Sequence, residues 1–228
     1  MIRNIAILFA VLILSGCAST KNIPMQDNAF VDNAPSSITT SSRVKPDFSA
    51  MTAGKGAFAL IGALASISAG NELIEQNQVD DPAVYISQSL TDSLKKQFSL
   101  KTISNNDTLI DSDQPSVIAK HYPSSDLVLD VQTINWSFIY FPTDWDNYRV
   151  IYTAKLRLID TRNKSMIAEG FCKRIPEEDE NAPSYEDLTS NQAQGLKNEL
   201  QLAAEHCIEE FSTKVLKIKP ATIQAVNT

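Results

Sequence analysis

Three long runs of alternating side chains between residues 126 and 175 constrain the fold of this chain more than any other feature. In the middle run, Val150 and Tyr152 fall on one side, while Thr153 and Arg157 fall on the other. A two-residue period rich in β-branched and aromatic side chains is typical of β-strands. Because short, turn-like connections separate the runs, an antiparallel meander is predicted over residues 126–141, 148–160 and 165–175.

One amphipathic helix is predicted before these runs in the sequence, and another after them. The first begins with Asp81 as N-cap and Pro82 in the first turn, and its apolar residues recur every three or four positions as far as Phe98. The second keeps the helical period from Leu196 to Val215. The expected class is therefore α+β: three long strands with one or two short ones, covered by a long C-terminal helix and a second amphipathic helix.

The composition excludes several classes of function. With 20 Lys and Arg against 27 Asp and Glu, the chain has a net charge of −7 and lacks the basic patch with which proteins bind nucleic acid. It has two histidines and no GxSxG, HExxH, CxxC or dinucleotide-binding motif, so no catalytic residue and no metal site is predicted. The acidic groups at residues 111–113, 144–146 and 177–180 lie in predicted turns and are expected to be solvated. We therefore expect a protein that is not an enzyme.

The N-terminus has the pattern of an export signal. One basic residue, Arg3, precedes an unbroken apolar run over residues 5–14, about half the length that a membrane-spanning helix needs. The run leads into the sequence LSGC, which ends at Cys17 and resembles the lipobox of bacterial lipoproteins. The resemblance implies cleavage between Gly16 and Cys17, so that residues 1–16 are removed as a signal peptide.

The lipobox resemblance also implies a covalent anchor at Cys17. In lipoproteins the thiol of this cysteine carries diacylglycerol, and its amino group carries a further acyl chain such as palmitate. Ala18 and Ser19 follow the cysteine here, whereas aspartate directly after it is the usual signal for the inner membrane. The implied location is the outer membrane, with the body facing the periplasm, and no cofactor other than this lipid is expected.

Composition divides the mature chain into three segments. Residues 17–46 are rich in Ser, Thr, Asn and Pro, and are predicted to form the lipidated cysteine and a flexible tether that reaches roughly 95 Å when fully extended. Residues 47–220 are predicted to form a single periplasmic α+β domain, followed by a tail over residues 221–228. In an alternative that the pattern leaves open, residues 29–31 or 38–40 add a short strand to the domain.

A segment of small and apolar residues, 53–70, carries no charge after Lys55. It fits two interpretations: a helix buried against its own domain, or a helix that contacts a partner or the membrane surface. Trp145, at the predicted tip of the first hairpin, is a further candidate for contact with a partner. In the second interpretation the contact residues of the segment are Phe58, Leu60, Ile61 and Leu64.

Two cysteines remain after Cys17, namely Cys172 on the third predicted strand and Cys207 on the apolar face of the last helix. Two such thiols in an oxidising periplasm are candidates for a disulfide. A bond that closes a loop of about 36 residues would stabilise the fold by roughly 3–4 kcal/mol in the chain-entropy model. The alternative is that both are buried, unpaired thiols, because the sequence does not fix the distance between their Cα atoms.

The order of elements behind the lipobox resembles the periplasmic α/β domains of three kinds of envelope protein. These are the curli-secretion lipoprotein, the lipoprotein activators of penicillin-binding proteins, and the amino-terminal domain of the Tol-system propeller protein. The similarity lies in residues 81–98, DPAVYISQSLTDSLKKQF, which lead into strands, and in the closing helix. Such domains usually open with a strong apolar strand, for which residues 43–51 are a poor substitute here.

These observations together lead us to expect a lipid-anchored, non-enzymatic accessory or binding protein of the cell envelope. It would act through protein contacts, either with another envelope protein or by self-association. A carrier or sensor domain that binds a small molecule or a lipid is the alternative, and an envelope hydrolase is the less favoured third interpretation.

Overall fold

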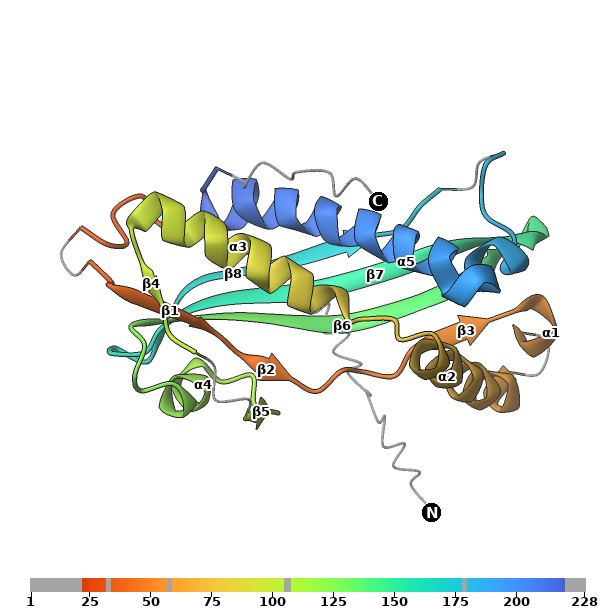
Figure 1. The fold of residues 1–228 in the computed structure, drawn as a ribbon, viewed down its shortest axis with the longest axis horizontal. Helices are drawn as coiled ribbons and strands as arrows, with labels where there is room; N and C mark the ends of the chain where they lie inside the picture. Colours follow the sequence, from red (N-terminus) through yellow and green to blue (C-terminus); the bar gives the residue numbers. More distant parts are fainter. Residues whose placement is uncertain (1–21, 32–33, 57–58, 105–107, 178–179, 220–228) are drawn as a thin grey trace, which may run out of the picture.

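The structure is a computed structural model that describes residues 22–31, 34–56, 59–104, 108–177 and 180–219. It confirms the α+β class, with helices on both faces of one sheet (Figure 1). The helices are α1 (Ala53–Gly56), α2 (Ala59–Gln76), α3 (Pro82–Phe98), α4 (Pro115–His121), α5 (Tyr185–Glu210) and the π-helix η1 (Phe211–Leu216). The strands are β1 (Ser37–Thr40), β2 (Ser42–Arg43), β3 (Ser49–Met51), β4 (Lys101–Thr102), β5 (Leu109–Ile110), β6 (Leu127–Phe141), β7 (Asp144–Asp160) and β8 (Ser165–Arg174).

The predicted meander forms the frame of the sheet. Strand β6 pairs antiparallel with β7, and β7 pairs antiparallel with β8. The first hairpin is tighter than predicted, since β7 begins at Asp144 rather than at residue 148 and only Pro142 and Thr143 separate the two strands. Trp145 therefore lies at the start of β7, beside the hairpin tip.

The predicted flexible tether is wrong for the part of it that the structure describes. Strand β1 lies inside the sheet, where Ile38 is fully buried and β1 runs parallel to both β4 and β6. Farther upstream, Ile23 pairs with Glu169 on the free edge of β8, and Met25 is buried. The folded body therefore begins near residue 22 rather than at 47, and the alternative in which residues 38–40 add a strand is confirmed.

The sequence of β1 explains why this strand was predicted only as an alternative. Its four residues, SITT, contain one large apolar side chain, whereas a strand buried on both faces normally shows a continuous apolar run. Backbone pairing and local polar contacts hold it instead: Ser36 donates its backbone N–H and its hydroxyl to the Asp126 carboxylate, both at 2.7 Å. Residues 1–21, including Cys17, and all of the predicted tail lie outside the described residues.

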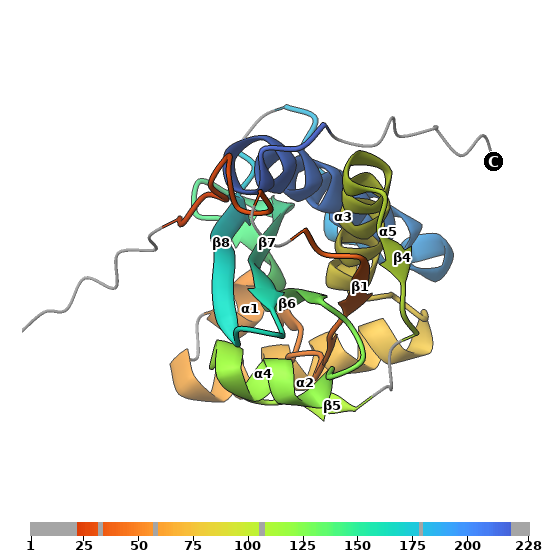
Figure 2. The same cartoon turned by 90° about the vertical axis from the view of Figure 1, so that its left-hand side faces the viewer.

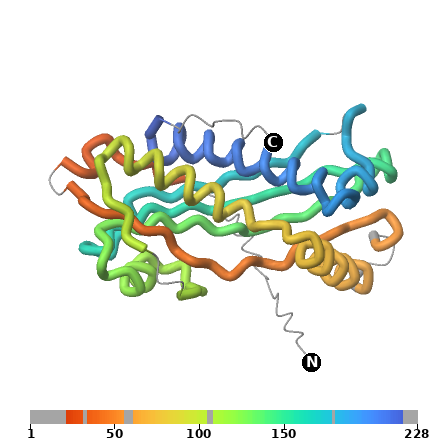
Figure 3. Tube along the Cα trace, viewed as in Figure 1, coloured from red at the N-terminus to blue at the C-terminus, as the bar shows by residue number. Residues whose placement is uncertain are grey.

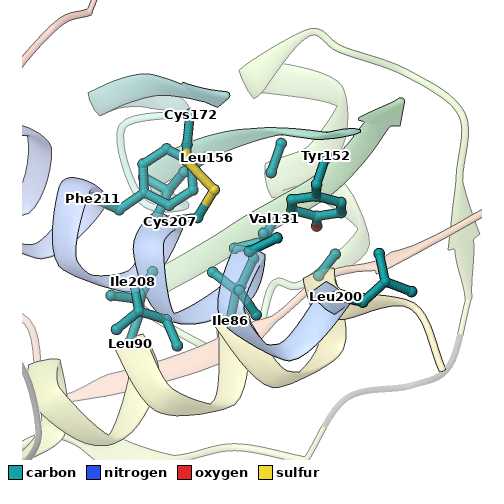
Figure 4. Packing of buried hydrophobic residues seen from close by; sticks show 14 of the residues in the cluster. Ile86, Leu90, Val131, Tyr152, Leu156, Cys172, Leu200, Cys207, Ile208 and Phe211 are labelled. Carbon is teal, nitrogen blue, oxygen red and sulfur yellow. A yellow bond between two sulfur atoms is a disulfide. The ribbon is translucent and has the colours of Figure 1, made fainter. Parts of the chain in front are cut away.

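Helices α3 and α5 cover one face of the sheet, as the periodicity predicted (Figures 1 and 2). Their apolar faces meet the sheet in one core, in which Ile86 and Leu90 of α3 and Leu200 of α5 pack with Val131 and Tyr152 of the sheet (Figure 4). All five side chains are buried. The predicted start of α3 is also confirmed, because the Asp81 carboxylate accepts a hydrogen bond from the Ala83 N–H at 2.9 Å.

A disulfide joins the sheet to α5 within this core. Cys172 on β8 and Cys207 on α5 are bonded, with their Cα atoms 5.5 Å apart, and both are fully buried (Figure 4). The predicted pairing is thus confirmed.

A buried group of charges lies on the opposite face of the sheet. Asp130 on β6 is fully buried, and its carboxylate accepts hydrogen bonds from Arg43 Nε, Arg43 Nη2 and Arg157 Nη1, each at 2.7 Å. Ser41 Oγ donates a further hydrogen bond to it. Arg157 also pairs with the exposed Asp113 at 2.8 Å. These contacts attach β2 and the segment around residue 113 to the central strands.

The two arginines keep Asp130 ionised. Burial by itself raises the pKa of this carboxyl, but the hydrogen bonds and charge of Arg43, with those of Ser41 and Arg157, hold the pKa below its ordinary value. A buried ion pair of this kind contributes little net stability when complete, whereas loss of one partner leaves a charge uncompensated in the interior.

Replacement of Asp130 should therefore be far more damaging than replacement of Asp113. We expect Asp130→Ala to lower the free energy of unfolding by about 3–5 kcal/mol, and Asp113→Ala, whose side chain is 63% exposed, by less than about 1 kcal/mol. Because the pKa of Asp130 is lowered on folding, its contribution is present above the unfolded pKa near 3.9 and is lost as the pH falls through the folded pKa. Urea denaturation of both variants measures the difference, and equal losses would contradict this role.

Candidate interaction surface

Over its first three turns, helix α2 packs in the opposite sense to an ordinary amphipathic helix. It buries small residues, Gly62, Ser66 and Gly70, against α1 and β3, and it exposes large apolar ones, whereas Ile74 near its end is buried in the core. Ile61 is 78% exposed and Leu64 is 71% exposed. We call the outward side that contains Ile61 and Leu64 the α2 face.

Close backbone contact explains why the small residues must point inward. A Cβ atom on Gly70 would overlap the carbonyl oxygen of Phe48, and one on Gly62 would overlap the carbonyl oxygen of Lys55. The Ser66 hydroxyl avoids an unsatisfied buried group by donating to the Gly62 carbonyl at 2.7 Å. Positions 62, 66 and 70 recur at four-residue spacing and thus share one side of the helix.

The large side chains of the α2 face gain nothing from this packing. Full burial of a Leu or Ile side chain contributes about 1.5–3 kcal/mol, and α2 forgoes most of that at Ile61 and Leu64 in the isolated chain. Contiguous exposed apolar groups on a folded protein mark a surface that contacts something else. The α2 face is therefore the strongest candidate for a binding surface.

A second exposed apolar group lies at the tip of the β6–β7 hairpin. Trp145 is 66% exposed; its indole N–H donates to the Pro142 carbonyl at 3.2 Å, and its ring lies edge-on to Tyr140 with the centroids 6.5 Å apart. These contacts hold the ring in a defined position at the surface. The hairpin tip, α1 and the start of α2 lie at the same end of the molecule (Figures 1 and 3).

Carboxylates accompany both apolar groups. Asp144 and Asp146 flank Trp145, and Glu72 and Glu75 are exposed on the last turns of α2. Helix α2 contains no Lys or Arg, whereas helices that lie on membranes are typically rich in both on their polar side. The charge therefore favours a protein contact over an anionic lipid surface. In the part of the chain that the structure describes, no helix has the length and apolar character needed to cross a membrane.

The structure shows the exposure of only some of the predicted contact residues. Ile61, Leu64 and Trp145 are exposed, so they are accessible to a partner, although the contact itself stays a prediction. Leu60 lies within α2, and Phe58 lies outside the described residues. The first interpretation of the segment, a helix buried on its own domain, applies to its small residues alone.

A groove lies between α3 and α5, beside the loop that leads into α3. It has a volume of about 610 Å³ and combines apolar and polar lining. The Asp81 carboxylate borders it and accepts a hydrogen bond from Thr133, whose hydroxyl is also 2.8 Å from that of Tyr152. Burial raises the pKa of Asp81 despite these hydrogen bonds, and burial raises that of Tyr152 as well. The lining includes Asp80, Asp81, Tyr85, Gln88, Lys197 and Leu200.

The sequence predicted neither the polar residues of the groove nor the ion pairs around Asp130. Asp81 was predicted as a helix cap but not as part of a groove. Asp113 was predicted to be solvated, yet it pairs with two arginines. The ion pair of Asp130 with Arg157 could have been predicted, because both charged residues stand within apolar strands. In the antiparallel register they lie directly opposite each other.

Comparison with known proteins identifies no sequence family. No family model matches the chain, and no curated protein matches it. Among solved structures, a PelC dodecamer from Paraburkholderia phytofirmans is 11% identical and covers 84% of this chain and 93% of its own, with a TM-score of 0.36. Lipoprotein GNA1162 from Neisseria meningitidis is 18% identical, with coverage of 79% and 100% and a TM-score of 0.31.

A third similar structure is a putative neuraminyllactose-binding hemagglutinin homolog from Helicobacter pylori. It is 12% identical, covers 81% of this chain and 84% of its own, and has a TM-score of 0.38. At these identities and TM-scores, the function has to be argued from the surfaces of the protein itself.

The inward packing of α2 predicts a strong difference between two glycine substitutions. In Gly70→Ala the new methyl group meets the backbone of Phe48, just before β3, which cannot yield as a side chain would, and we expect a loss of about 1–3 kcal/mol in the free energy of unfolding. In Gly54→Ala nothing lies within 4 Å of the new methyl group, so stability should stay the same or rise by up to about 1 kcal/mol. Chemical denaturation of the two variants tests the packing, and a Gly70→Ala protein as stable as the control would contradict it.

Proposed function

We propose that this protein is a lipid-anchored, non-enzymatic accessory protein of the cell envelope, held at the outer membrane and facing the periplasm. Its α+β body binds another envelope protein through the α2 face. The observation that carries the proposal is the reversed packing of α2, which buries Gly62, Ser66 and Gly70 while it exposes Ile61 and Leu64. A helix whose only task was to cover its own sheet would bury Ile61 and Leu64 as it buries Ile74.

The position of the first described residues limits where the body can lie. Five residue steps separate Cys17 from Asn22, and a chain of that length spans at most about 18 Å. Just after this segment, the backbone of Ile23 exchanges hydrogen bonds with that of Glu169 on β8, at 2.7 and 2.9 Å. With Cys17 lipidated, the body therefore stays close to the membrane, and its partner has to be reachable there.

The charges around the α2 face indicate the chemistry of the partner. The apolar contact would be made by Ile61 and Leu64, with Glu72 and Glu75 farther along the same helix. The chain as a whole carries a net charge of −7. The matching surface is an apolar patch with basic residues at its margin, because unlike charges at the rim of an interface raise the association rate and suppress wrong partners.

The buried ionisable groups support a role without catalysis. Asp130 is used in ion pairs with Arg43 and Arg157, and Asp81 caps α3. Each of these carboxylates thus has a structural task.

A carrier or sensor domain is the second candidate, and the groove between α3 and α5 is the observation that favours it. Its volume of about 610 Å³ is within the range of small-molecule sites. Asp80 and Asp81 would favour a ligand with a cationic group, and Leu200 offers apolar contact. Co-purification of a small molecule with the protein, lost on filling the groove by Gln201→Trp at an exposed residue of its lining, would support this candidate.

Photo-cross-linking in intact cells tests the proposed contact. A photoreactive residue at position 61 should form a cross-link with a defined envelope protein, and Leu64→Asp should reduce the yield about tenfold, which corresponds to about 1.4 kcal/mol in binding. The matched control is Leu202→Asp, which alters a 48% exposed leucine on α5 and should leave the yield unchanged. Because both substitutions lie on helix surfaces, thermal melting should show a folded body in each.

Two results would contradict the proposed contact. One is an equal yield from the Leu64→Asp and control proteins. The other is a cross-link to lipid alone, which would make the α2 face a membrane contact.

A further inference from the structure

Three potential metal ligands converge where α5 meets β8, and a fourth lies beside them. Donor atoms of Cys172, His206 and Glu210 lie within 4.8 Å of one another. The fourth, Cys207, is joined to Cys172 in the disulfide. The surface contacts proposed above do not use this cluster.

The helix geometry places Glu210 between His206 and Cys207 on the surface of α5, although His206 and Cys207 themselves, as adjacent residues, point about 100° apart. His206 and Glu210 are four positions apart, and Cys207 and Glu210 are three apart, which are the spacings at which helical side chains are neighbours. Cys172 approaches from the strand beneath. The cluster runs from the buried sulfur to the surface, since Cys172 is fully buried, Glu210 is partly buried and the His206 side chain is 49% exposed.

We propose that reduction of the Cys172–Cys207 disulfide converts this cluster into a zinc site, with Cys172, Cys207, His206 and Glu210 as its ligands. Cys172 and Cys207 then either form the disulfide or bind the ion, but not both at once. In the oxidised protein neither sulfur is available as a thiolate, so the site forms only after reduction.

The reaction balances with a dithiol as reductant. The dithiol transfers two electrons and two protons to the disulfide and becomes a disulfide itself, and Cys172 and Cys207 are left as thiols. Zn²⁺ then forms a bond to each sulfur and displaces one proton from each thiol. In reverse, an oxidant of the disulfide class takes two electrons from the zinc-bound thiolates, the sulfur–sulfur bond forms again, and the ion is released.

The donor set suits zinc better than other common ions. Zinc accepts sulfur, nitrogen and carboxylate oxygen together and prefers four ligands in a tetrahedron, with bonds of about 2.0–2.3 Å. Such bonds place the ligand atoms about 3.3–3.8 Å from one another. The separations of up to 4.8 Å among Cys172, His206 and Glu210 therefore need to shorten by about 1 Å. His206 and Glu210 can supply that movement because both side chains reach toward solvent. The sulfur of Cys207, once the disulfide is reduced, has to move away from that of Cys172 to about 3.8 Å and turn toward the ion. Calcium and magnesium, by contrast, prefer oxygen ligands alone.

One existing contact competes with the ion. Lys214 Nζ pairs with Glu210 at 2.9 Å, and His206 Nε2 lies 3.7 Å from the same carboxylate. The Lys214 side chain is 65% exposed, and an exposed helical ion pair of this spacing contributes only about 0.3–0.5 kcal/mol. Zinc can therefore displace Lys214 at little cost in stability.

Titration of the full mature protein with Co²⁺, which substitutes for zinc and absorbs light when bound to thiolate, tests the proposal. After reduction by a phosphine that does not bind the ion, we expect saturable binding of one Co²⁺ with thiolate-to-metal absorption, and displacement by Zn²⁺. The oxidised protein should show no such absorption. His206→Gln and Glu210→Gln should each weaken binding by about tenfold or more, and His121→Gln, at the other histidine of the chain, should not.

Three results would overturn the proposed site. The first is the absence of thiolate absorption in the reduced protein, whether or not that protein stays folded by circular dichroism. The second is equal binding in the reduced and oxidised forms. The third is equal affinity in the His206→Gln, Glu210→Gln and His121→Gln proteins. The α2 face plays no part in this measurement, so failure here leaves the proposed partner contact untouched.

Discussion

The antiparallel pairing of β6 with β7 is the constraint on which the rest of the structure depends. The outer edge of β6 receives β1 and β3, both in parallel, and the outer edge of β7 receives β8. A register shift between Thr133 and Asn135 changes which residues of β6 face the helices. Leu129 and Val131 before the shift and Trp136 and Phe138 after it all belong to one core. The same pairing sets Asp130 opposite Arg157, so it also places the buried charges of the second face.

Strong periodicity made much of this fold predictable. The two-residue alternation of β7 and the helical spacing of Ile86, Leu90 and Leu94 follow directly from which face is buried. The Cys172–Cys207 bond was predicted because two thiols remain after Cys17 and export places them in an oxidising compartment, although the sequence left their distance open. Strand β1 was predicted only as an alternative, because it is positioned by backbone pairing with β4 and β6 rather than by its side chains. The ion group around Asp130 depends on distant segments, since Arg43 and Asp130 are 87 residues apart.

The composition of helix α2 predicts a helix but does not fix which of its sides is buried. Small and large apolar residues alternate in it, so either set could have been buried. Backbone proximity to Phe48 and Lys55 decides the choice, because at Gly62 and Gly70 a side chain would overlap a carbonyl oxygen. Ile61 and Leu64 then have to face outward. The exposed apolar surface is thus a consequence of how closely the helix packs, and it is what links the fold to the proposed contact with a partner.

The most direct test of that link is the accessibility of the α2 face in its native setting. A cysteine placed at position 61 or 64 can be labelled with a maleimide in intact envelopes and in the purified protein, with a cysteine at position 202 on α5 as the reference. The account predicts rapid labelling of all three in the purified protein, and protection of positions 61 and 64, but not of 202, in the envelope. Equal labelling of the three positions in both settings would contradict it.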